Sequence, residues 1–171
     1  MPSRFILCFL LACFPEIYGQ QALSVDNIKI GMTLADVKAV HPKANIKEVP
    51  NKYGNCADDD YTGYEIRERN KLIAFVILNT DQKIKRIVVT SPKFKFNGVN
   101  TKSTVDDILK HHPEAKLSMN SLDDWEYIYL QNPDMTIGFE TDENSRIGIY
   151  DDETVVGIKR KSASVDFIII E

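Results

Sequence analysis

The sequence predicts an α+β fold made of two tandem helix-plus-antiparallel-sheet units, with the short helices packed on one face of the sheet. Three observations favour this fold. The segment TLADVKAVHPKA at 33–44 recurs 71 positions later as TVDDILKHHPEA at 104–115. Apolar residues in both copies follow the spacing of a helix. After each copy, the chain contains runs in which apolar and polar residues alternate, which is typical of strands.

Each copy of the repeat begins with a helix-capping signal. Thr33 is followed three positions later by Asp36, and Thr104 by Asp107. A threonine hydroxyl at a helix start accepts the N–H of the third helical residue, while a carboxylate there accepts the threonine N–H and lies near the positive helix end. We therefore expect a short helix to begin after each threonine.

The apolar residues of each expected helix lie on one stripe, and a proline ends the helix. The stripes consist of Leu34, Val37 and Val40 in the first copy and of Val105, Ile108 and Leu109 in the second. Pro42 and Pro113 follow His41 and His112. The residue before a proline avoids the helical region, and proline has no N–H to donate. Each helix is therefore expected to have one face to bury.

Alternation with a period of two predicts strands in both halves. The expected strands are 61–67, 72–78, 83–89, 125–130, 135–140, 147–150, 154–159 and 165–170. The strand 72–78 is apolar on both faces, so we expect it to lie inside a sheet. The offset of 71 also places Ile84 and Ile87 over Val155 and Ile158, which predicts that the strand near the end of each unit repeats.

The chain divides into a leader and the two units. The first unit is expected at 20–92 and the second at 93–171, as one compact pair. A unit of about seventy residues with one short helix is marginal alone, so we expect the sheets to join edge to edge or to pack through the helices.

Residues 1–19 have the features of a secretory signal peptide. Arg4 precedes the apolar run FILCFLLACF, and the polar PEIYGQQ follows, with cleavage expected after Gly19. An alternative is a lipoprotein, because Leu10-Leu11-Ala12-Cys13 resembles a lipobox whose cysteine is acylated. Both routes predict a bacterial periplasmic or secreted protein, and a membrane is a partner only if Cys13 carries lipid.

The charge balance argues against a nucleic-acid partner. Lys and Arg number 21 and Asp and Glu 25, for a formal net charge of −4, and removing residues 1–19 leaves this charge unchanged. Nucleic-acid binding needs clustered positive charge. Cleavage also removes Cys8 and Cys13, so Cys56 is left without an internal disulfide partner.

No motif in the sequence predicts an enzyme. A serine elbow, a phosphate-binding loop, a zinc-binding helix and a dinucleotide fingerprint are all absent from the sequence. His41, His111 and His112 lie at the ends of the expected helices, where the helix dipole favours them. Cys56 as a nucleophile, with no histidine placed beside it, is the remaining enzyme hypothesis. We expect no catalytic residue, metal or cofactor.

The expected strand 125–130 carries a row of aromatic residues. Trp125, Tyr127 and Tyr129 share one face, and Ile128 and Leu130 share the other. If the aliphatic face meets the helices, the aromatic row faces outward and offers large, stiff side chains that can anchor a partner. The alternative is that the aromatic row is itself covered core.

Two acidic segments lie beside aromatic residues. The first is the run 58–60, beside Tyr61 and Tyr64, and the second is Asp123-Asp124, just before Trp125. The run 58–60 lacks the pattern of a calcium loop and is interpreted as a solvated turn that attracts a basic partner. The expected partner-binding residues are Trp125, Tyr127, Tyr129, Tyr61, Tyr64, Asp58, Asp59, Asp60, Asp123 and Asp124.

The helix opening Ile30-Gly31-Met32-Thr33, followed by Val37, resembles the GMT-x-x-x-V opening of two groups of secreted bacterial proteins. One group is the tandem-repeat β-lactamase inhibitory proteins, in which two helix-plus-sheet units form a concave, aromatic-rich surface that grips an enzyme. The other is the small outer-membrane assembly lipoproteins of the SmpA/OmlA type, which have one such unit. The resemblance implies a rigid protein-binding scaffold.

The sequence therefore favours a non-enzymatic periplasmic or secreted protein-binding module. We expect an inhibitor or immunity protein against a basic enzyme or toxin that acts on the envelope. The alternative is an envelope-assembly or housekeeping lipoprotein anchored through Cys13.

Overall fold

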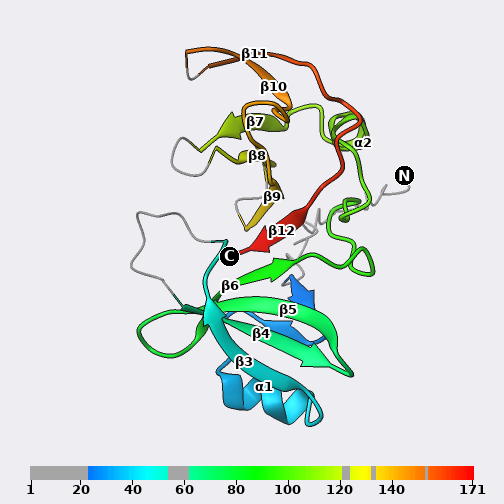
Figure 1. The fold of residues 1–171 in the computed structure, drawn as a ribbon. Helices are drawn as coiled ribbons and strands as arrows, with labels where there is room; N and C mark the ends of the chain where they lie inside the picture. The colour runs from blue at the N-terminus through cyan, green and yellow to red at the C-terminus, as the bar shows by residue number, and fades with distance from the viewer. Residues whose placement is uncertain (1–22, 54–61, 121–123, 132–133, 153) are drawn as a thin grey trace, which may run out of the picture.

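The computed structural model describes residues 23–53, 62–120, 124–131, 134–152 and 154–171, and Figure 1 shows how their helices and strands are arranged. The elements in chain order are β1 (Ser24–Val25), β2 (Ile28–Lys29), α1 (Leu34–Val40), β3 (Asn45–Pro50), β4 (Thr62–Glu68), β5 (Lys71–Leu78), β6 (Ile84–Val89), α2 (Val105–His111), β7 (Lys116–Met119), β8 (Glu126–Tyr129), β9 (Met135–Phe139), β10 (Gly148–Asp151), β11 (Thr154–Ile158) and β12 (Phe167–Ile170).

The capping signals at the start of both helices are confirmed. In α1 the Asp36 N–H donates to the Thr33 hydroxyl oxygen at 3.2 Å, and the Thr33 N–H donates to the Asp36 carboxylate at 2.8 Å. The corresponding distances between Thr104 and Asp107 in α2 are 3.2 and 2.9 Å. The helices end at His41 and His112, immediately before the prolines. Among the described residues, no helix is long and apolar enough to cross a membrane.

The apolar stripe is confirmed in α2 and wrong at one position of α1. Val37 in α1 and Val105 and Ile108 in α2 are buried, whereas Val40 is 46% exposed. Each step of three residues falls about 60° short of a full helical turn. Two such steps carry Val40 about 120° away from Leu34, so Val40 leaves the buried face.

Strands β3 to β9 and β12 form one antiparallel sheet, here called the main sheet, in the order β3-β4-β5-β6-β12-β9-β8-β7. The two halves of the chain meet where β12 pairs with β6, with Ile168 opposite Val89 and Ile170 opposite Ile87. Figure 1 shows this seam in the middle of the molecule. β5 lies inside the sheet, as its apolar composition predicts.

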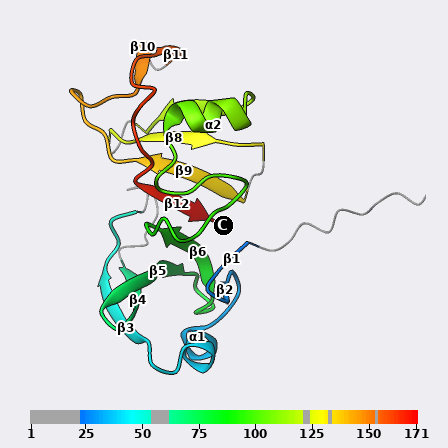
Figure 2. The ribbon, with the colours of Figure 1, turned by 90° about the vertical axis from the view of Figure 1, so that its right-hand side faces the viewer.

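The main sheet has a different hydrophobic cluster on each face. The helix face packs Val37 of α1 and Ile108 of α2 against strand residues such as Val76. The opposite face, here called the aromatic face, includes Phe75 and Phe167. Figure 2 shows the helices lying alongside the strands at the two ends of the molecule. The α+β class, with the described helices on one face of a largely antiparallel sheet, is thus confirmed.

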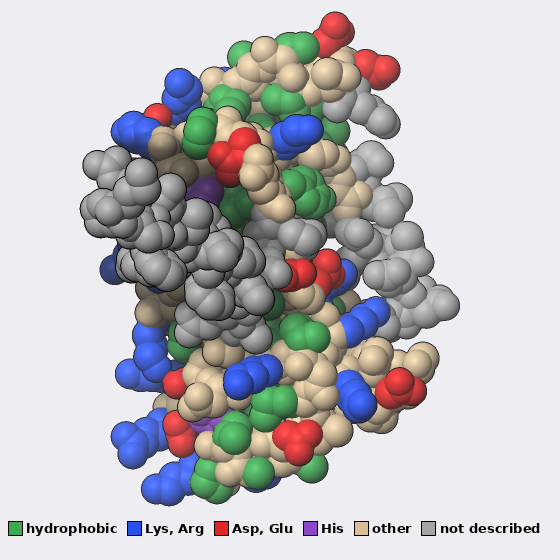
Figure 3. All heavy atoms as spheres, turned by 180° about the vertical axis from the view of Figure 1, so that it is seen from behind, with side chains coloured by type: hydrophobic (Ala, Val, Ile, Leu, Met, Phe, Trp, Pro, Cys, Tyr) green, Lys and Arg blue, Asp and Glu red, His purple; other side chains and the backbone are tan. Residues whose placement is uncertain are grey.

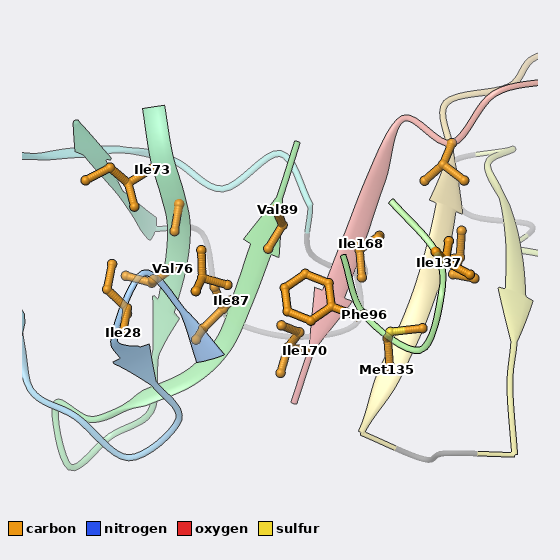
Figure 4. Packing of buried hydrophobic residues seen from close by; sticks show 14 of the residues in the cluster. Ile28, Ile73, Val76, Ile87, Val89, Phe96, Met135, Ile137, Ile168 and Ile170 are labelled. Carbon is orange, nitrogen blue, oxygen red and sulfur yellow. The ribbon is translucent and has the colours of Figure 1, made fainter. Parts of the chain in front are cut away.

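The seam between β6 and β12 is packed on the helix face. Figure 4 shows the Phe96 ring among Val89, Ile168 and Ile170, which come from both halves of the chain. Phe96 is 6% exposed, and its backbone pairs with that of Val99 in a tight turn before α2. Side chains from both halves therefore share one core.

The predicted match between Ile84 and Val155 is wrong. The Ile84 N–H donates to the Met32 carbonyl at 2.8 Å, and the Val165 N–H donates to the Ser103 carbonyl at 3.0 Å. Met32 and Ser103 are 71 positions apart, but Ile84 and Val165 are 81 apart. The extra residues hold the hairpin β10–β11, which forms its own sheet. The offset of 71 positions between the two halves therefore no longer holds after this inserted hairpin.

Candidate functional site

The aromatic face is organised around Phe167 of β12. The Phe167 ring centroid lies 5.1 Å from that of Tyr53, 5.4 Å from that of Trp125 and 6.1 Å from that of Tyr127. Tyr53 also contacts Phe75 edge-on at 5.2 Å. Ring pairs at these separations add about 0.5–1.5 kcal/mol to the burial of their area. The cluster therefore links β5, β8 and β12 across the seam of the main sheet.

The predicted row on β8 lies on this face, with graded exposure. Tyr127 is 7% exposed, Trp125 is half-buried and Tyr129 is 48% exposed. Ile128 lies in the cluster of the helix face, as the alternation predicts. Tyr127 is therefore part of the core, which agrees with the alternative that the row is covered. Tyr129 is open to solvent, which agrees with the alternative that the row faces outward.

Two glycines let the phenylalanine rings lie against the sheet. A Cβ on Gly138 of β9 would lie 2.1 Å from the nearest atoms of the Phe167 ring, and a Cβ on Gly63 of β4 would lie 2.0 Å from the Phe75 ring. Real Cβ atoms do not approach so closely, so a side chain at either position would displace the ring. The rings are thereby held flat over the neighbouring strands.

A hollow of about 140 Å³ opens beside the cluster, between Tyr53 and the β8 row. Tyr127, Tyr129 and Arg86 are among its lining residues. The Arg86 Nε atom donates to the Glu171 carboxylate at 2.6 Å, and its Nη1 atom donates to the Tyr53 carbonyl at 3.4 Å. The hollow thus combines aromatic walls with a guanidinium whose side chain is 14% exposed.

A lysine lies against Tyr53 at the border of this face. The Lys52 Nζ atom lies 4.7 Å from the centroid of the Tyr53 ring. The side-chain hydrogen bond with Tyr53 raises the pKa of Lys52 above its ordinary range. Lys52 therefore keeps its positive charge at neutral pH and stays available to a cation–π contact.

Other predicted contact residues lie elsewhere. Tyr64 packs on the helix face, where its hydroxyl donates to the Glu48 carboxylate at 3.3 Å. Asp124 pairs with Arg146 at 3.0 Å, so its charge is compensated locally. The remaining predicted contact residues lie outside the described residues; they are Tyr61, Asp58, Asp59, Asp60 and Asp123. Cys56, the nucleophile of the enzyme hypothesis, also lies outside them.

Sequence reasoning missed most of the aromatic cluster. Phe75 and Phe167 fall in predicted strands, but their faces depend on the register between strands, which the sequence does not show. Tyr53 follows a strand that was not predicted, β3. The available signal was the glycines at 63 and 138, because a glycine inside a strand marks a close approach.

A buried carboxylate and the histidines have structural roles. Glu126 is fully buried and accepts hydrogen bonds from the Ile147 N–H at 2.6 Å, the Gly148 N–H at 2.7 Å and the Tyr150 hydroxyl at 2.6 Å. These bonds attach the hairpin β10–β11 to the main sheet. His41 is tied to a backbone carbonyl. Among the described residues, no group of three or more acidic, histidine or cysteine side chains is placed to hold a metal ion.

The fold of this chain also occurs in a protein of known structure. No protein-family model and no curated protein match the chain. The structure is similar to the crystal structure of the uncharacterized protein yfeY from Escherichia coli, with a TM-score of 0.57 and 12% sequence identity over 88% of this chain and 97% of that chain. At this identity the likeness shows the fold alone.

Proposed function

We propose that the chain is a periplasmic or secreted protein-binding module that uses the aromatic face as its contact surface. The observation that carries the proposal is the gradient of exposure along β8. Tyr127 is held in the core, while the neighbouring Tyr129 ring, 6.4 Å away, is open to solvent. A solvent-exposed aromatic ring supported by buried rings is preorganised, and preorganised aromatic side chains are the usual anchors of protein interfaces.

We propose further that the face is built by two tandem units. Two relationships support this organisation. The turn carbonyls of Asp26 and Asn97 each meet a histidine at the end of the following helix, and both the carbonyls and the histidines are 71 positions apart. Both halves then contribute strands to one sheet. In this arrangement neither unit has to bury its sheet edge alone, because β6 and β12 cover each other.

The target we propose is a basic enzyme or toxin that acts on the bacterial envelope, which this chain inhibits or neutralises. The formal net charge of −4 favours encounter with a basic protein. The extended sheet with an aromatic face supports the resemblance to tandem-repeat inhibitory proteins. No step of this function requires a catalytic residue, because binding alone blocks an active site.

The test is capture of envelope and secreted proteins by the immobilised chain, followed by activity assays on whatever is captured. Tyr129→Ala is the decisive variant, because Tyr129 is exposed and its loss leaves the core intact. Ile149→Ala is the matched control, since Ile149 is also 48% exposed but lies on the hairpin β10–β11.

The expected result is that Tyr129→Ala lowers the affinity for the captured enzyme by at least about tenfold, while Ile149→Ala leaves it unchanged. The activity of the enzyme falls when the wild-type chain is added. Equal capture by both variants removes the aromatic face from the proposal, and capture without inhibition removes the inhibitor role.

The second candidate function is that of an envelope lipoprotein, which the segment Leu10-Leu11-Ala12-Cys13 favours. Mass spectrometry of the mature amino terminus separates the two. A diacylated Cys13 supports a membrane-anchored assembly or housekeeping role, and an unmodified amino terminus at Gln20 excludes it. A thiol enzyme based on Cys56 is excluded if Cys56→Ser retains every activity found.

A further inference from the structure

A second concave surface lies away from the aromatic face. It has a volume of about 280 Å³ and lies between the β4–β5 turn and the segment that follows β6. Leu72, Ile73 and Phe94 are its apolar lining residues. Arg69, Lys71 and Lys93 also line it. It shares no lining residue with the aromatic hollow. We call it the basic groove.

The β4–β5 turn presents two cations to the groove. Arg69 and Asn70 have φ values of 49° and 63°, which are typical of a two-residue hairpin turn. The Arg67 guanidinium donates to the Asn70 carbonyl at 3.3 Å and so stabilises this turn. Within the part of the chain that the structure describes, Arg69 and Lys71 form no ion pair and are exposed. Both charges are therefore available to a ligand.

The third cation is only partly compensated. The Lys93 Nζ atom lies 3.5 Å from the Asp26 carboxylate and 5.0 Å from the centroid of the Phe94 ring, and its side chain is 67% exposed. Glu68 is the carboxylate among the lining residues. Positive charge therefore prevails locally in a chain whose formal net charge is −4. Figure 3 shows Lys and Arg side chains gathered along the margin of the half that holds α1.

We propose that the basic groove binds the phosphate group of an anionic phospholipid, so that this end of the main sheet contacts a membrane surface. Arg69 and Lys71 bind the phosphate oxygens, because a guanidinium and an ammonium are the side chains suited to that group. Leu72 and Phe94 contact the apolar part of the lipid next to the phosphate. A lipid carries an anion and an apolar chain side by side, as the groove requires.

The amino-terminal side of the chain lies at the same place. Asp26, which pairs with Lys93, belongs to the turn between β1 and β2. Cys13 precedes Asp26 by 13 residues, a length of chain that reaches about 45 Å at most. A lipid on Cys13 would therefore hold the groove close to the membrane, where its cations add electrostatic attraction to anionic lipid. The groove binds anionic lipid whether or not Cys13 is acylated.

The test is sedimentation of the whole chain with lipid vesicles. Vesicles of phosphatidylcholine report any binding by the apolar amino-terminal residues, and vesicles enriched in phosphatidylglycerol add the anion. The double variant Arg69→Gln/Lys71→Gln is expected to lower the partition coefficient on the anionic vesicles by at least about tenfold, because each cation near such a surface strengthens binding several-fold. It leaves binding to the neutral vesicles unchanged.

The matched control is Lys116→Gln/Lys159→Gln. It removes the same charge from exposed positions in the other half of the chain, so binding to the anionic vesicles stays within about twofold of the wild type. The proposal is overturned if anionic vesicles bind no better than neutral ones, or if both double variants lose binding equally. Binding of polyglutamate is measured with the same variants. The proposal is also overturned if Arg69→Gln/Lys71→Gln weakens the binding of polyglutamate but not the binding of anionic vesicles, because the groove then binds an acidic peptide.

Discussion

The Nε2 atom of His41 lies 2.6 Å from the carbonyl oxygen of Asp26. A carbonyl oxygen only accepts hydrogen bonds, so Nε2 carries the proton and donates it. The bond joins the end of α1 to the turn between β1 and β2. His112 makes the same contact with the Asn97 carbonyl at 2.8 Å, at the end of α2. The histidines of the repeat therefore fasten each helix to the turn that precedes it.

Replacing these histidines tests how much their hydrogen bonds to the turn carbonyls contribute to the free energy of unfolding. His41→Ala is expected to lower the free energy of unfolding by about 1–3 kcal/mol, because it removes a buried ring and leaves the Asp26 carbonyl without its partner in a part-buried site. His112→Ala is expected to cost less, since His112 is half-buried and water can replace its hydrogen bond. Urea unfolding measures both values. A larger loss at His112 would contradict this ranking.

The helix caps predict how stability depends on pH in acid. Hydrogen bonds from Thr33 hold the pKa of Asp36 below its ordinary value of 3.8, and Thr104 does the same for Asp107. The folded state therefore binds fewer protons than the unfolded state near this pH. The stability that the caps contribute is present above pH 3.8 and is lost as the pH falls through the lowered pKa.

The double variant Asp36→Ala/Asp107→Ala checks this linkage. It is expected to be less stable than the wild type above about pH 5, and the difference shrinks as the wild-type carboxylates become protonated at lower pH. Urea unfolding at a series of pH values measures the difference. A gap that stays constant down to the acid end of the series would remove the caps as its cause.

Tyr150 stabilises the fold by donating a hydrogen bond to the buried carboxylate of Glu126. Tyr150→Phe removes one of the donors to Glu126 and is expected to lower the free energy of unfolding by about 1–3 kcal/mol. Burial and the hydrogen bond to Glu126 raise the pKa of Tyr150. Its contribution is therefore complete below pH 10 and is lost as the pH rises further.

Urea unfolding of the wild type and of Tyr150→Phe, at neutral and at alkaline pH, measures both effects. The gap between the two proteins is expected to narrow at alkaline pH. Tyr129→Phe is the control, because Tyr129 is exposed and does not contact Glu126 through any of the hydrogen bonds that hold the hairpin. An equal loss in Tyr129→Phe would show that the effect does not come from Glu126.

The glycine under Phe167 predicts a packing defect. Gly138→Ala places a methyl group in the space of the Phe167 ring and is expected to cost about 1–3 kcal/mol. The fluorescence of Trp125 changes as well, because the Trp125 ring lies 5.4 Å from that of Phe167. Gly157→Ala is the control, since the added Cβ lies 3.3 Å from its nearest neighbour. Equal costs in the two variants would argue against tight packing at Phe167.

The helices and most strands of this fold are encoded locally, which is why the sequence predicts them. A threonine with an aspartate three positions later marks a helix start by its own hydrogen bonds, and a proline marks its end. The strands β3 and β7, at the two edges of the main sheet, were missed for different reasons. β3 does not alternate strictly between polar and apolar residues, and β7 alternates over only 4 residues, which is too short a run to identify a strand.

The candidate site depends on contacts that local patterns do not contain. The row on β8 was found because its side chains alternate within one strand. Phe75 and Phe167 come together with Tyr53 only through the register of β5, β6 and β12. The hollow beside the aromatic cluster likewise brings together Arg86 and Glu171, which are 85 positions apart in the sequence. Such long-range pairing is set by the whole sheet.

The position of β12 has a consequence for biosynthesis. This strand comes last among the described elements, yet it fits between β6 and β9 and completes both. A nascent chain that lacks β12 leaves the edges of β6 and β9 unpaired, and each edge can form intermolecular strand pairs with another nascent chain. Both edges are therefore covered only after β12 has been synthesised and has inserted between β6 and β9.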